Sequence, residues 1–512
     1  MLAKLYGCAV FGVDASIVTI EVNVSAGAKH FIVGLPDNAV KESWSRTESA
    51  LKQSGYKMPN SRVIINLAPA DIKKEGSAYD LPIALGLLYA SDQMGTELLD
   101  AYLIMGELSL DGEVRPIRGA LPMAIEARKH KYKGFILPKE NATEAAIVND
   151  LDVIGVECLQ DAKAFISGEK KIKPLEVNTR DIFYDQINDY EADFKDVQGQ
   201  ENIKRALEIA AAGGHNIIMI GPPGAGKTML AKRLPSILPP LNLHEALETT
   251  KIHSIAGKLG TDATLISNRP YRSPHHTISD VALVGGGGFP QPGEISLAHN
   301  GVLFLDELPE FKRSVLEVMR QPLEERRVTI SRAKFTIDYP ANFMLVASMN
   351  PCPCGFYNHP EKECVCGPGQ VQRYLNKISG PLLDRIDLHV EVTPVTFDEM
   401  TTIRKNETSK EIRERVIKAR EKQTTRFNNE NNIYSNAMMP PPMVKEICVI
   451  NQAGRTLLKT AIEKLGLSAR AYDRILKVSR TIADLIDAED IQIEHLAEAI
   501  QYRSLDREGW IA

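Results

Sequence analysis

Residues 217–228 read Ile217-Ile-Met-Ile-Gly221-Pro-Pro-Gly-Ala-Gly-Lys227-Thr228, and a helical pattern follows them. A buried strand, a glycine-rich loop and a helix, in this order, form the context in which a loop cradles phosphate groups. The glycines let backbone N–H groups converge on phosphate, and the positive end of the helix adds to the field. We therefore expect a nucleotide site formed by Gly221, Pro222, Pro223, Gly224, Ala225, Gly226, Lys227 and Thr228.

A second apolar run, Gly301-Val-Leu-Phe-Leu-Asp306-Glu307, ends in two carboxylates. Parallel α/β sheets bind ligands at the carboxyl ends of their strands, so both acids are expected beside the phosphate loop. Lys227 should then reach the β- and γ-phosphates of ATP. Thr228 and Asp306 should hold Mg²⁺, and Glu307 should polarise the attacking water. A glycine-rich turn and a solvated acidic pair are the plainer interpretations of the two motifs, and the combination of motifs argues against both.

The bulk properties are those of an ordinary globular protein with several domains. The chain has 512 residues, and its net charge of -5 neither shows nor excludes a nucleic-acid partner. The N-terminal run shows no signal-peptide pattern, and no stretch approaches the length of a membrane-spanning segment. We expect a cytoplasmic protein with no membrane partner.

Composition and periodicity divide the chain into four parts. We expect an α/β domain over residues 1–168, from alternating runs such as Val18 to Val24 and helical stretches such as Leu81 to Ala90. A polar, charged linker covers 169–193. Short apolar strands at Asn216 to Ile220, Val302 to Leu305 and Phe343 to Ala347 predict a parallel-sheet core over 194–396. Helical patterns, including Asp473 to Leu485 and Ile493 to Tyr502, predict a helical lid over 397–512.

Several further motifs resemble those of one family across essentially the whole chain. They are Asp196-Val-Gln-Gly-Gln200, Arg272-Ser-Pro-His-His-Thr277, Pro292-Gly-Glu-Ile-Ser-Leu-Ala-His-Asn-Gly301, Ser348-Met-Asn-Pro-Cys-Pro-Cys-Gly355 and Gly380-Pro-Leu-Leu-Asp-Arg-Ile-Asp387. With the phosphate loop, they resemble the YifB/ComM group of magnesium-chelatase-like AAA+ ATPases. The resemblance implies an AAA+ P-loop core with a helical lid, assembled as a homo-hexamer.

The resemblance also implies roles for single residues. Asn350 takes the sensor-1 position and orients the hydrolytic water. Arg385 acts as an arginine finger on the γ-phosphate of the neighbouring subunit, where a cation supplied in trans couples hydrolysis to assembly. Taken alone, Arg385 could equally form a surface salt bridge. Arg470 is the sensor-2 arginine of the lid, and Arg474, one turn further on, could take its place.

Two segments are candidates for handling a substrate. The alternation in Arg327-Val-Thr-Ile-Ser-Arg-Ala-Lys-Phe-Thr-Ile-Asp-Tyr339 predicts a hairpin with Arg332 and Lys334 at its tip. The residues alone suggest a hairpin whose cations serve solubility. In the family's wider clade this hairpin projects into the pore of the ring, which makes Arg332 and Lys334 candidate DNA contacts. The segment Val284-Gly-Gly-Gly-Gly-Phe-Pro-Gln-Pro-Gly293 resembles the helix-2 insert of the same clade.

Four of the seven cysteines lie within fifteen residues, as Cys352-Pro-Cys354 and Cys364-Val-Cys366. They could ligate one structural zinc, although two-residue gaps are commoner than the single-residue gaps found here. His359 could replace one ligand, but a lone loop histidine is more often solvated. The adjacent His275 and His276 do not by themselves argue for a metal.

The N-terminal domain resembles the Lon-protease type of ribosomal-S5-like fold. The resemblance rests on Lys73-Lys-Glu-Gly-Ser-Ala-Tyr-Asp-Leu-Pro-Ile-Ala-Leu-Gly86, Gly106-Glu-Leu-Ser-Leu-Asp-Gly-Glu-Val-Arg-Pro-Ile-Arg-Gly119 and Ile136-Leu-Pro-Lys-Glu-Asn141. The nucleophilic serine of Lon falls at Ala78 and its lysine near Pro122, so no peptidase activity is expected. Ser77 is interpreted as structural. The domain is assigned to assembly or DNA engagement, with Lys73 and Lys74 as candidate contacts.

The resemblance implies an ATP-driven hexameric DNA translocase or helicase. Its expected work is branch migration during homologous recombination of incoming DNA in natural transformation, on single-stranded and branched DNA. The alternative is a chelatase-like remodelling ATPase that acts on a protein partner. The expected cofactors are ATP and Mg²⁺, with zinc as an additional candidate.

Overall fold

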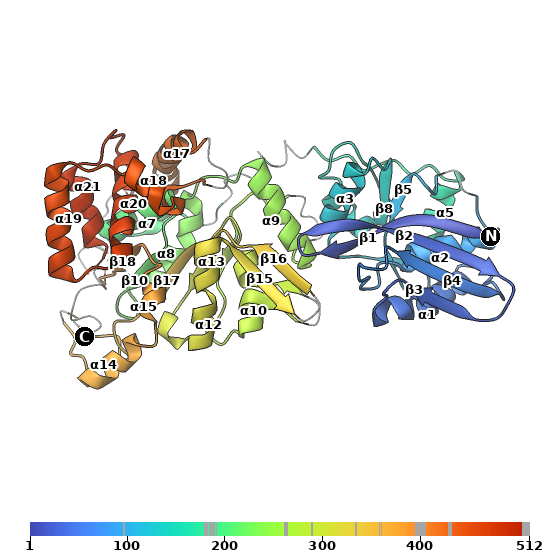
Figure 1. The fold of residues 1–512 in the computed structure, drawn as a ribbon, viewed down its shortest axis with the longest axis horizontal. Coiled ribbons are helices and arrows are strands. Elements are labelled where there is room, and N and C mark those ends of the chain that lie inside the picture. The colour runs from blue at the N-terminus through green and yellow to red at the C-terminus, as the bar shows by residue number, and fades with distance from the viewer. Residues whose placement is uncertain are drawn as a thin grey trace. The chain divides into compact units, whose positions relative to one another are not determined.

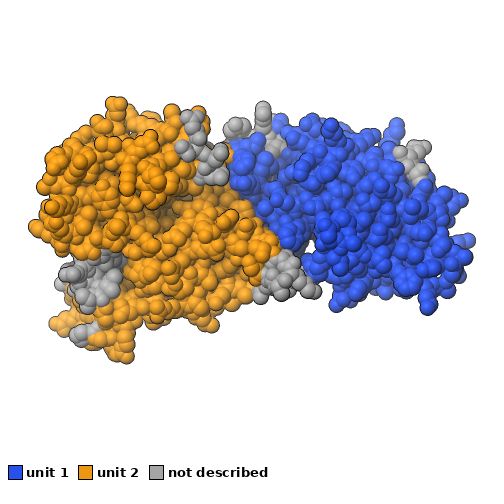
Figure 2. Space-filling model, in the orientation of Figure 1, with its two compact units in different colours: residues 1–186, 243–267 blue, residues 187–242, 268–512 orange. Residues whose placement is uncertain are grey.

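The computed structural model divides the chain into two compact units (Figures 1 and 2). Unit 1 comprises Met1–Gln186 and Leu243–Ser267, and unit 2 comprises Ile187–Asn242 and Asn268–Ala512. The structure describes residues 1–95, 98–178, 183, 190, 192–260, 265–287, 290–332, 335–357, 359, 361–394, 406–428 and 433–503. In these ranges no helix is both long and apolar enough to cross a membrane.

Unit 1 is built on a mixed seven-stranded sheet. Its strand order is β3-β4-β2-β1-β5-β8-β9, in which β1, β2 and β4 pair antiparallel and the other neighbours pair in parallel. The strands are β1 (Leu2–Phe11), β2 (Asp14–Ser25), β3 (His30–Val33), β4 (Arg62–Ala68), β5 (Tyr102–Ile104), β8 (Gly134–Pro138) and β9 (Asp152–Val156). A separate two-stranded ribbon pairs β6 (Glu107–Leu108) with β7 (Val114–Arg115). The mixed α/β fold expected for residues 1–168 is confirmed.

The helices of unit 1 include one from the middle of the chain. They are α1 (Asn38–Gln53), α2 (Asp80–Ala90), α3 (Ala120–Lys129), α4 (Lys139–Ala145), α5 (Leu159–Ile166) and α9 (Leu243–Ile255). The buried Ser254 of α9 accepts a hydrogen bond from Gly119 N and donates from Oγ to Glu144, and Lys251 Nζ lies 3.1 Å from Asp14 Oδ1. These bonds attach α9 to unit 1, so the chain leaves unit 2 after Asn242 and returns at Asn268. The domain borders predicted from sequence, at residues 168, 193 and 396, stay predictions.

The residues that align with the catalytic positions of Lon lie among structural contacts in unit 1. Ala78 lies just before α2, Pro122 lies inside α3, and Ser77 Oγ donates to Glu107. The neighbouring Asp80 is buried and forms an ion pair with Arg46 at 2.6 Å. Ser77 thus has the structural role expected of it.

The two lysines proposed as DNA contacts in unit 1 are engaged elsewhere. Lys74 is fully buried and its Nζ donates to the carbonyl of Pro69. The hypothesis that Lys74 contacts DNA is wrong for this reason, because a buried ammonium cannot reach a phosphate backbone. Lys73 forms an ion pair with Glu75 at the surface.

The core of unit 2 is an entirely parallel five-stranded sheet, in the order β11-β14-β17-β10-β18. The strands are β11 (Tyr271–Arg272), β14 (Val302–Leu305), β17 (Met344–Met349), β10 (Ile217–Ile220) and β18 (Leu388–Glu391). Every residue of β10, β14 and β17 is buried, which explains their continuous apolar runs. The three strands predicted from these runs are confirmed, and their carboxyl ends meet at one edge.

Short helices and ribbons surround this sheet. They are α7 (Glu201–Gly213), α8 (Lys227–Arg233), α10 (Asp280–Val284), β12 (Gly285–Gly286), β13 (Gln291–Pro292), α11 (Glu294–Leu297), α12 (Arg313–Val318), α13 (Arg320–Glu325), β15 (Arg327–Arg332), β16 (Phe335–Pro340), α14 (Pro368–Leu375) and α15 (Gly380–Leu383). Single 3₁₀ turns lie at Phe194–Asp196, Leu234–Ile237, Leu308–Glu310 and Asn436–Met438.

A bundle of helices completes unit 2, as the lid prediction required (Figure 1). Its members are α17 (Ser409–Arg426), α18 (Pro441–Ile447), α19 (Gln452–Leu465), α20 (Ala469–Leu485) and α21 (Ile493–Gln501). One hydrophobic core runs from the sheet into this bundle, from Ile217 of β10 to Ile475 and Leu496 of the bundle. The bundle and the sheet therefore fold as one unit.

Candidate nucleotide and metal sites

The glycine-rich loop joins β10 to α8 at the carboxyl edge of the parallel sheet. Gly226 has φ 84° and caps α8 in the left-handed region, a conformation that glycine adopts at little cost. The side-chain amide of Gln200 donates to the carbonyl of Ala225 at 2.9 Å, so the Asp196–Gln200 motif holds this loop. The backbone N–H groups at the start of α8 are thereby presented at the sheet edge, as anion binding requires.

Lys227 lies at the centre of the site. Its side chain is buried, and Nζ donates to the carbonyls of Gly221 at 2.6 Å and Pro222 at 2.9 Å and to Asn350 Oδ1 at 3.0 Å. Burial lowers the pKa of Lys227, and the nearby Asp306 and Glu307 oppose this shift. The structure thus brings Lys227, the first residue of α8, into direct contact with Asn350, which follows β17, a contact that was not predicted from sequence.

The carboxylate of Asp306 lies where β14 ends and receives three donors. Thr228 Oγ1 donates to Oδ2 at 2.7 Å, while Ser348 Oγ and the backbone N–H of Glu307, at 3.1 Å, donate to Oδ1. Hydroxyl and carboxylate oxygens are the hard ligands that Mg²⁺ prefers, so the donor set fits this ion. The sequence analysis gave Ser348 no role. Ser348 stands two residues before Asn350, and alternate residues of a strand share a face. This spacing could have predicted that Ser348 lies in the site.

Glu307 is held in an unusual backbone conformation beside a histidine. Its φ is 53°, a left-handed value that is uncommon for a residue with a side chain and is often found at functional sites. Its carboxylate is exposed, and Oε2 lies 3.8 Å from Nδ1 of His276. From sequence, His276 was part of a family motif and not by itself an argument for a metal, and the structure places it next to the predicted catalytic carboxylate.

The two arginines proposed for catalysis contact residues outside the phosphate loop. Arg385 is buried, and its guanidinium donates to the carbonyl of Pro381 at 2.5 Å and to Glu324. Arg470 is exposed and lies 3.7 Å from Asp384, whereas Arg474 is bonded to the buried Asp387. The roles of Arg385 and Arg470 stay predictions.

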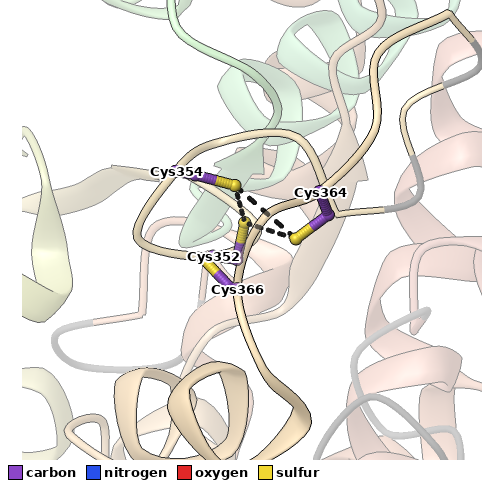
Figure 3. A group of neighbouring side chains, drawn as sticks. All are labelled: Cys352, Cys354, Cys364 and Cys366. Carbon is purple, nitrogen blue, oxygen red and sulfur yellow. Dashed lines mark hydrogen bonds between the residues drawn. The ribbon is translucent and has the colours of Figure 1, made fainter.

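The four clustered cysteines converge in one loop that begins two residues after Asn350 (Figure 3). The Sγ atoms of Cys352, Cys354 and Cys364 are 3.3 to 3.6 Å apart, and those of all four, including Cys366, lie within 4.8 Å of one another. Four thiolates at this spacing fit a tetrahedral zinc ion with Zn–S bonds of about 2.3 Å. Hydrogen bonds, first among them that from the backbone N–H of Phe356, lower the pKa of Cys354 to about 6, which favours its thiolate. The pKa values of Cys364 and Cys366 are raised, with hydrogen bonds to the neighbouring thiols among the causes.

His359 is not part of this cluster. Its Nδ1 accepts hydrogen bonds from the backbone N–H groups of Glu361 and Lys362, both at 3.1 Å. The suggestion that His359 replaces a cysteine ligand is wrong, because the ligand atoms that lie within 4.8 Å of one another come from the four cysteines and not from His359.

The two candidate substrate-handling elements contact each other. β15 and β16 pair antiparallel from Arg327↔Pro340 to Arg332↔Phe335, which confirms the predicted hairpin. Tyr339 Oη donates to the carbonyl of Pro290 at 2.7 Å, so the hairpin contacts the segment 284–293. Lys334 and the side chain of Arg332, the proposed DNA contacts, lie outside the described residues.

Comparisons with known proteins cover nearly the whole chain. Family models described as magnesium chelatase, subunit ChlI, as subunit ChlI of Mg-chelatase and as magnesium chelatase, subunit ChlI C-terminal match residues 193–400, 20–141 and 406–503. Competence protein ComM of Haemophilus influenzae is 45% identical over 508 residues, 99% of this chain and 98% of that protein. The uncharacterized protein YifB of Escherichia coli is 44% identical over 511 residues, with the same coverage. Lon protease 2 of Bacillus subtilis is 32% identical over 153 residues, 28% of this chain and 27% of that protein.

Proposed function

Because the chain belongs to the YifB/ComM family of magnesium-chelatase-like AAA+ proteins, we propose that it is an ATP-driven DNA translocase that moves branch points. ATP hydrolysis is supported by one observation. Lys227, Asn350, Thr228 and Asp306 converge at one edge of the sheet. Lys227 and Thr228 open α8, after the loop that follows β10, while Asp306 and Asn350 directly follow β14 and β17. Together they have the chemistry that phosphoryl transfer needs.

Each residue has a distinct role in this proposal. The N–H groups of the loop and Lys227 bind the β- and γ-phosphates, while Thr228 and Asp306 hold Mg²⁺. When bound there, Mg²⁺ would supply positive charge that offsets the negative charge of the phosphates. Glu307 accepts a proton from the attacking water, and His276 orients its carboxylate. Asn350 positions the same water.

Hydrolysis is coupled to assembly through Arg385 in a homo-hexamer. To reach the γ-phosphate of the neighbouring subunit, Arg385 exchanges its bond to Glu324 for one to the phosphate. The charge that develops on the γ-phosphate in the transition state favours this exchange. Arg470, exposed on the lid, acts on the phosphate as the sensor-2 residue.

The substrate is single-stranded and branched DNA. The β15–β16 hairpin carries Arg332 and Lys334 toward the phosphate backbone, and the contact between Tyr339 and Pro290 makes it move together with the segment 284–293. One relative is named a competence protein, which supports a role in the recombination of incoming DNA during natural transformation.

We further propose that the protein acts in the cytoplasm and that the four cysteines bind a structural zinc. We also propose that the Lon-like domain has no peptidase activity, because Ala78 and Pro122 stand at the catalytic positions.

The proposal is tested on a synthetic four-way or three-strand DNA junction with ATP. We compare the wild type with Lys227→Ala and with Arg332→Ala plus Lys334→Ala, and use Arg455→Ala plus Lys445→Ala, two exposed cations of the lid, as the control of equal charge. We expect both test variants to lose junction movement and only the hairpin variant to retain ATP hydrolysis. ATP hydrolysis without DNA stimulation or junction movement in the wild type would contradict a DNA motor and favour a remodelling ATPase with a protein substrate.

A further inference from the structure

An open cleft of about 340 Å³ lies in unit 2, between two segments that follow Glu307 and the cysteine loop in the chain. One wall is the turn Leu308–Glu310 and the start of α12, which directly follow Glu307. The other wall is α14 and the residues after it, which directly follow the cysteine loop. Its lining is Pro309, Glu310, Phe311, Arg313, Arg373, Asn376 and Lys377.

The lining is strongly cationic. Three of its side chains are positively charged and one, Glu310, is negatively charged. Glu310 is paired with Lys377 at 3.3 Å. Arg373 donates from Nε to the carbonyl of Gly369 at 2.9 Å, and in the described ranges no carboxylate lies within ion-pair distance of Arg373 or Arg313. Two guanidinium groups are therefore available for an anionic ligand.

The shape and chemistry of the cleft favour phosphate over a protein partner. The two apolar lining residues, Phe311 and Pro309, are buried, so the lining presents no exposed large apolar side chain of the kind that anchors protein interfaces. Exposed guanidinium groups and the amide of Asn376 instead present N–H donors, and the planar fork of arginine matches phosphate oxygens. The excess of positive charge complements a polyanion.

We propose that this cleft binds the phosphodiester backbone of single-stranded DNA through Arg313 and Arg373, an inference that rests on the proposed function. The cleft is joined to the site of hydrolysis, since the backbone N–H of Glu310 donates to the carbonyl of Glu307 at 2.8 Å. A phosphate that contacts Lys377 competes with Glu310 for its ammonium. DNA bound in the cleft therefore changes the surroundings of Glu307, the residue that activates water. Loss of the cleft should lower DNA-stimulated hydrolysis more than basal hydrolysis.

The test compares the wild type with Arg313→Ala plus Arg373→Ala. The matched controls are Arg313→Lys plus Arg373→Lys, which keeps the charge, and Arg455→Ala plus Lys445→Ala, which removes two exposed cations of the lid. Binding of a fluorescently labelled oligothymidylate is measured by anisotropy over a range of salt concentrations, with a non-hydrolysable ATP analogue present. ATP hydrolysis with and without the oligonucleotide and the mass of the assembly are measured in parallel.

We expect the alanine pair to weaken binding about tenfold at physiological salt and to reduce the salt slope by about 1.4, as two lost phosphate contacts require. DNA stimulation of hydrolysis should fall, while basal hydrolysis and assembly mass stay unchanged. The lysine pair should keep most of the salt slope, and the lid pair should bind like the wild type.

Three results would overturn the inference, and they have different meanings. If the wild type binds DNA and the alanine pair binds it equally, with the same salt slope, the cleft is not the DNA site but the proposed function stands. If the alanine pair loses assembly mass, the cleft contacts a second copy of the chain. If the wild type binds no oligonucleotide with ATP analogue, with ADP or without nucleotide, the proposed function itself is wrong.

Discussion

Gly355, in the cysteine loop, lies directly against Pro223 of the phosphate loop. A Cβ atom on Gly355 would lie only 2.5 Å from Cδ of Pro223, and Gly355 has φ 87°. The cysteine loop begins two residues after Asn350, whose Oδ1 accepts a hydrogen bond from Lys227. The cysteine cluster is thus connected to the phosphate loop twice, through the chain after Asn350 and through the contact at Gly355.

The first prediction is that Gly355→Ala weakens ATP binding. The added methyl group displaces Pro223, and a left-handed φ costs a residue with a side chain about 1–2 kcal/mol. We expect the affinity for a fluorescent ATP analogue to fall about tenfold, because 1.4 kcal/mol corresponds to that factor. Gly367→Ala is the control, since Gly367 lies in the same segment with φ -67° and its Cβ would meet nothing within 4 Å. Equal ATP affinity in the two variants would mean that the phosphate loop tolerates the displacement.

The second prediction concerns metal removal. The wild type should contain one zinc ion per chain, and Cys364→Ser should contain none. The substitution removes one of four ligands whose Sγ atoms lie within 4.8 Å of one another. Loss of the metal releases the loop that supports Pro223, so ATP affinity should fall as well. Elemental analysis and nucleotide titration measure the two effects, and Cys158→Ser in unit 1 is the control. Full zinc content in Cys364→Ser would exclude the four-cysteine site.

The third prediction separates nucleotide binding from hydrolysis. Lys227→Ala should lose both, because Lys227 supplies the buried cation of the phosphate loop. Glu307→Gln should keep ATP binding and lower hydrolysis at least 100-fold, since an amide cannot accept the proton of the attacking water. Nucleotide titration and phosphate release measure these effects. Substantial hydrolysis by Glu307→Gln would place the general base elsewhere.

The fourth prediction tests Ser348, whose hydroxyl donates to Asp306. Ser348→Ala should raise the Mg²⁺ concentration needed for half-maximal hydrolysis about 10- to 100-fold, the usual cost of losing a hydrogen bond that orients a metal ligand. Ser314→Ala is the control, because Ser314 is exposed and bonds to Asp280 away from the site. An unchanged Mg²⁺ dependence in Ser348→Ala would show that Asp306 needs no orientation by this hydroxyl.

Strands and motifs were predictable from sequence where the residue pattern of a single segment determines the element. β14 was found because its apolar run ends in Asp306 and Glu307, and the hairpin was found from its alternation. Contacts between distant segments were not predictable. The bond from Ser348 to Asp306, the position of His276 beside Glu307 and the burial of Lys74 depend on tertiary packing. The helical pattern of α9 likewise does not reveal that the helix packs in unit 1.

The last prediction distinguishes two arginines of α20 that sequence alone leaves interchangeable. Arg474 is bonded to Asp387, which is buried and also accepts a hydrogen bond from Asn216 N at 2.9 Å. Although burial raises the pKa of Asp387, Arg474 and the hydrogen bonds hold it well below the ordinary value. Arg470 is 60% exposed, and its partner Asp384 lies 3.7 Å away.

Arg474→Ala should therefore destabilise unit 2 by about 3–5 kcal/mol at neutral pH, because it leaves a buried carboxylate without its cation. Arg470→Ala should cost at most about 1 kcal/mol, as an exposed pair does. Hydrogen exchange of α20 measures both effects. Since the folded pKa of Asp387 is depressed, its contribution is present above about pH 4 and lost on acidification, so the cost of Arg474→Ala should shrink at low pH. A cost that is independent of pH would mean that Arg474 stabilises α20 by packing and not through the charge of Asp387.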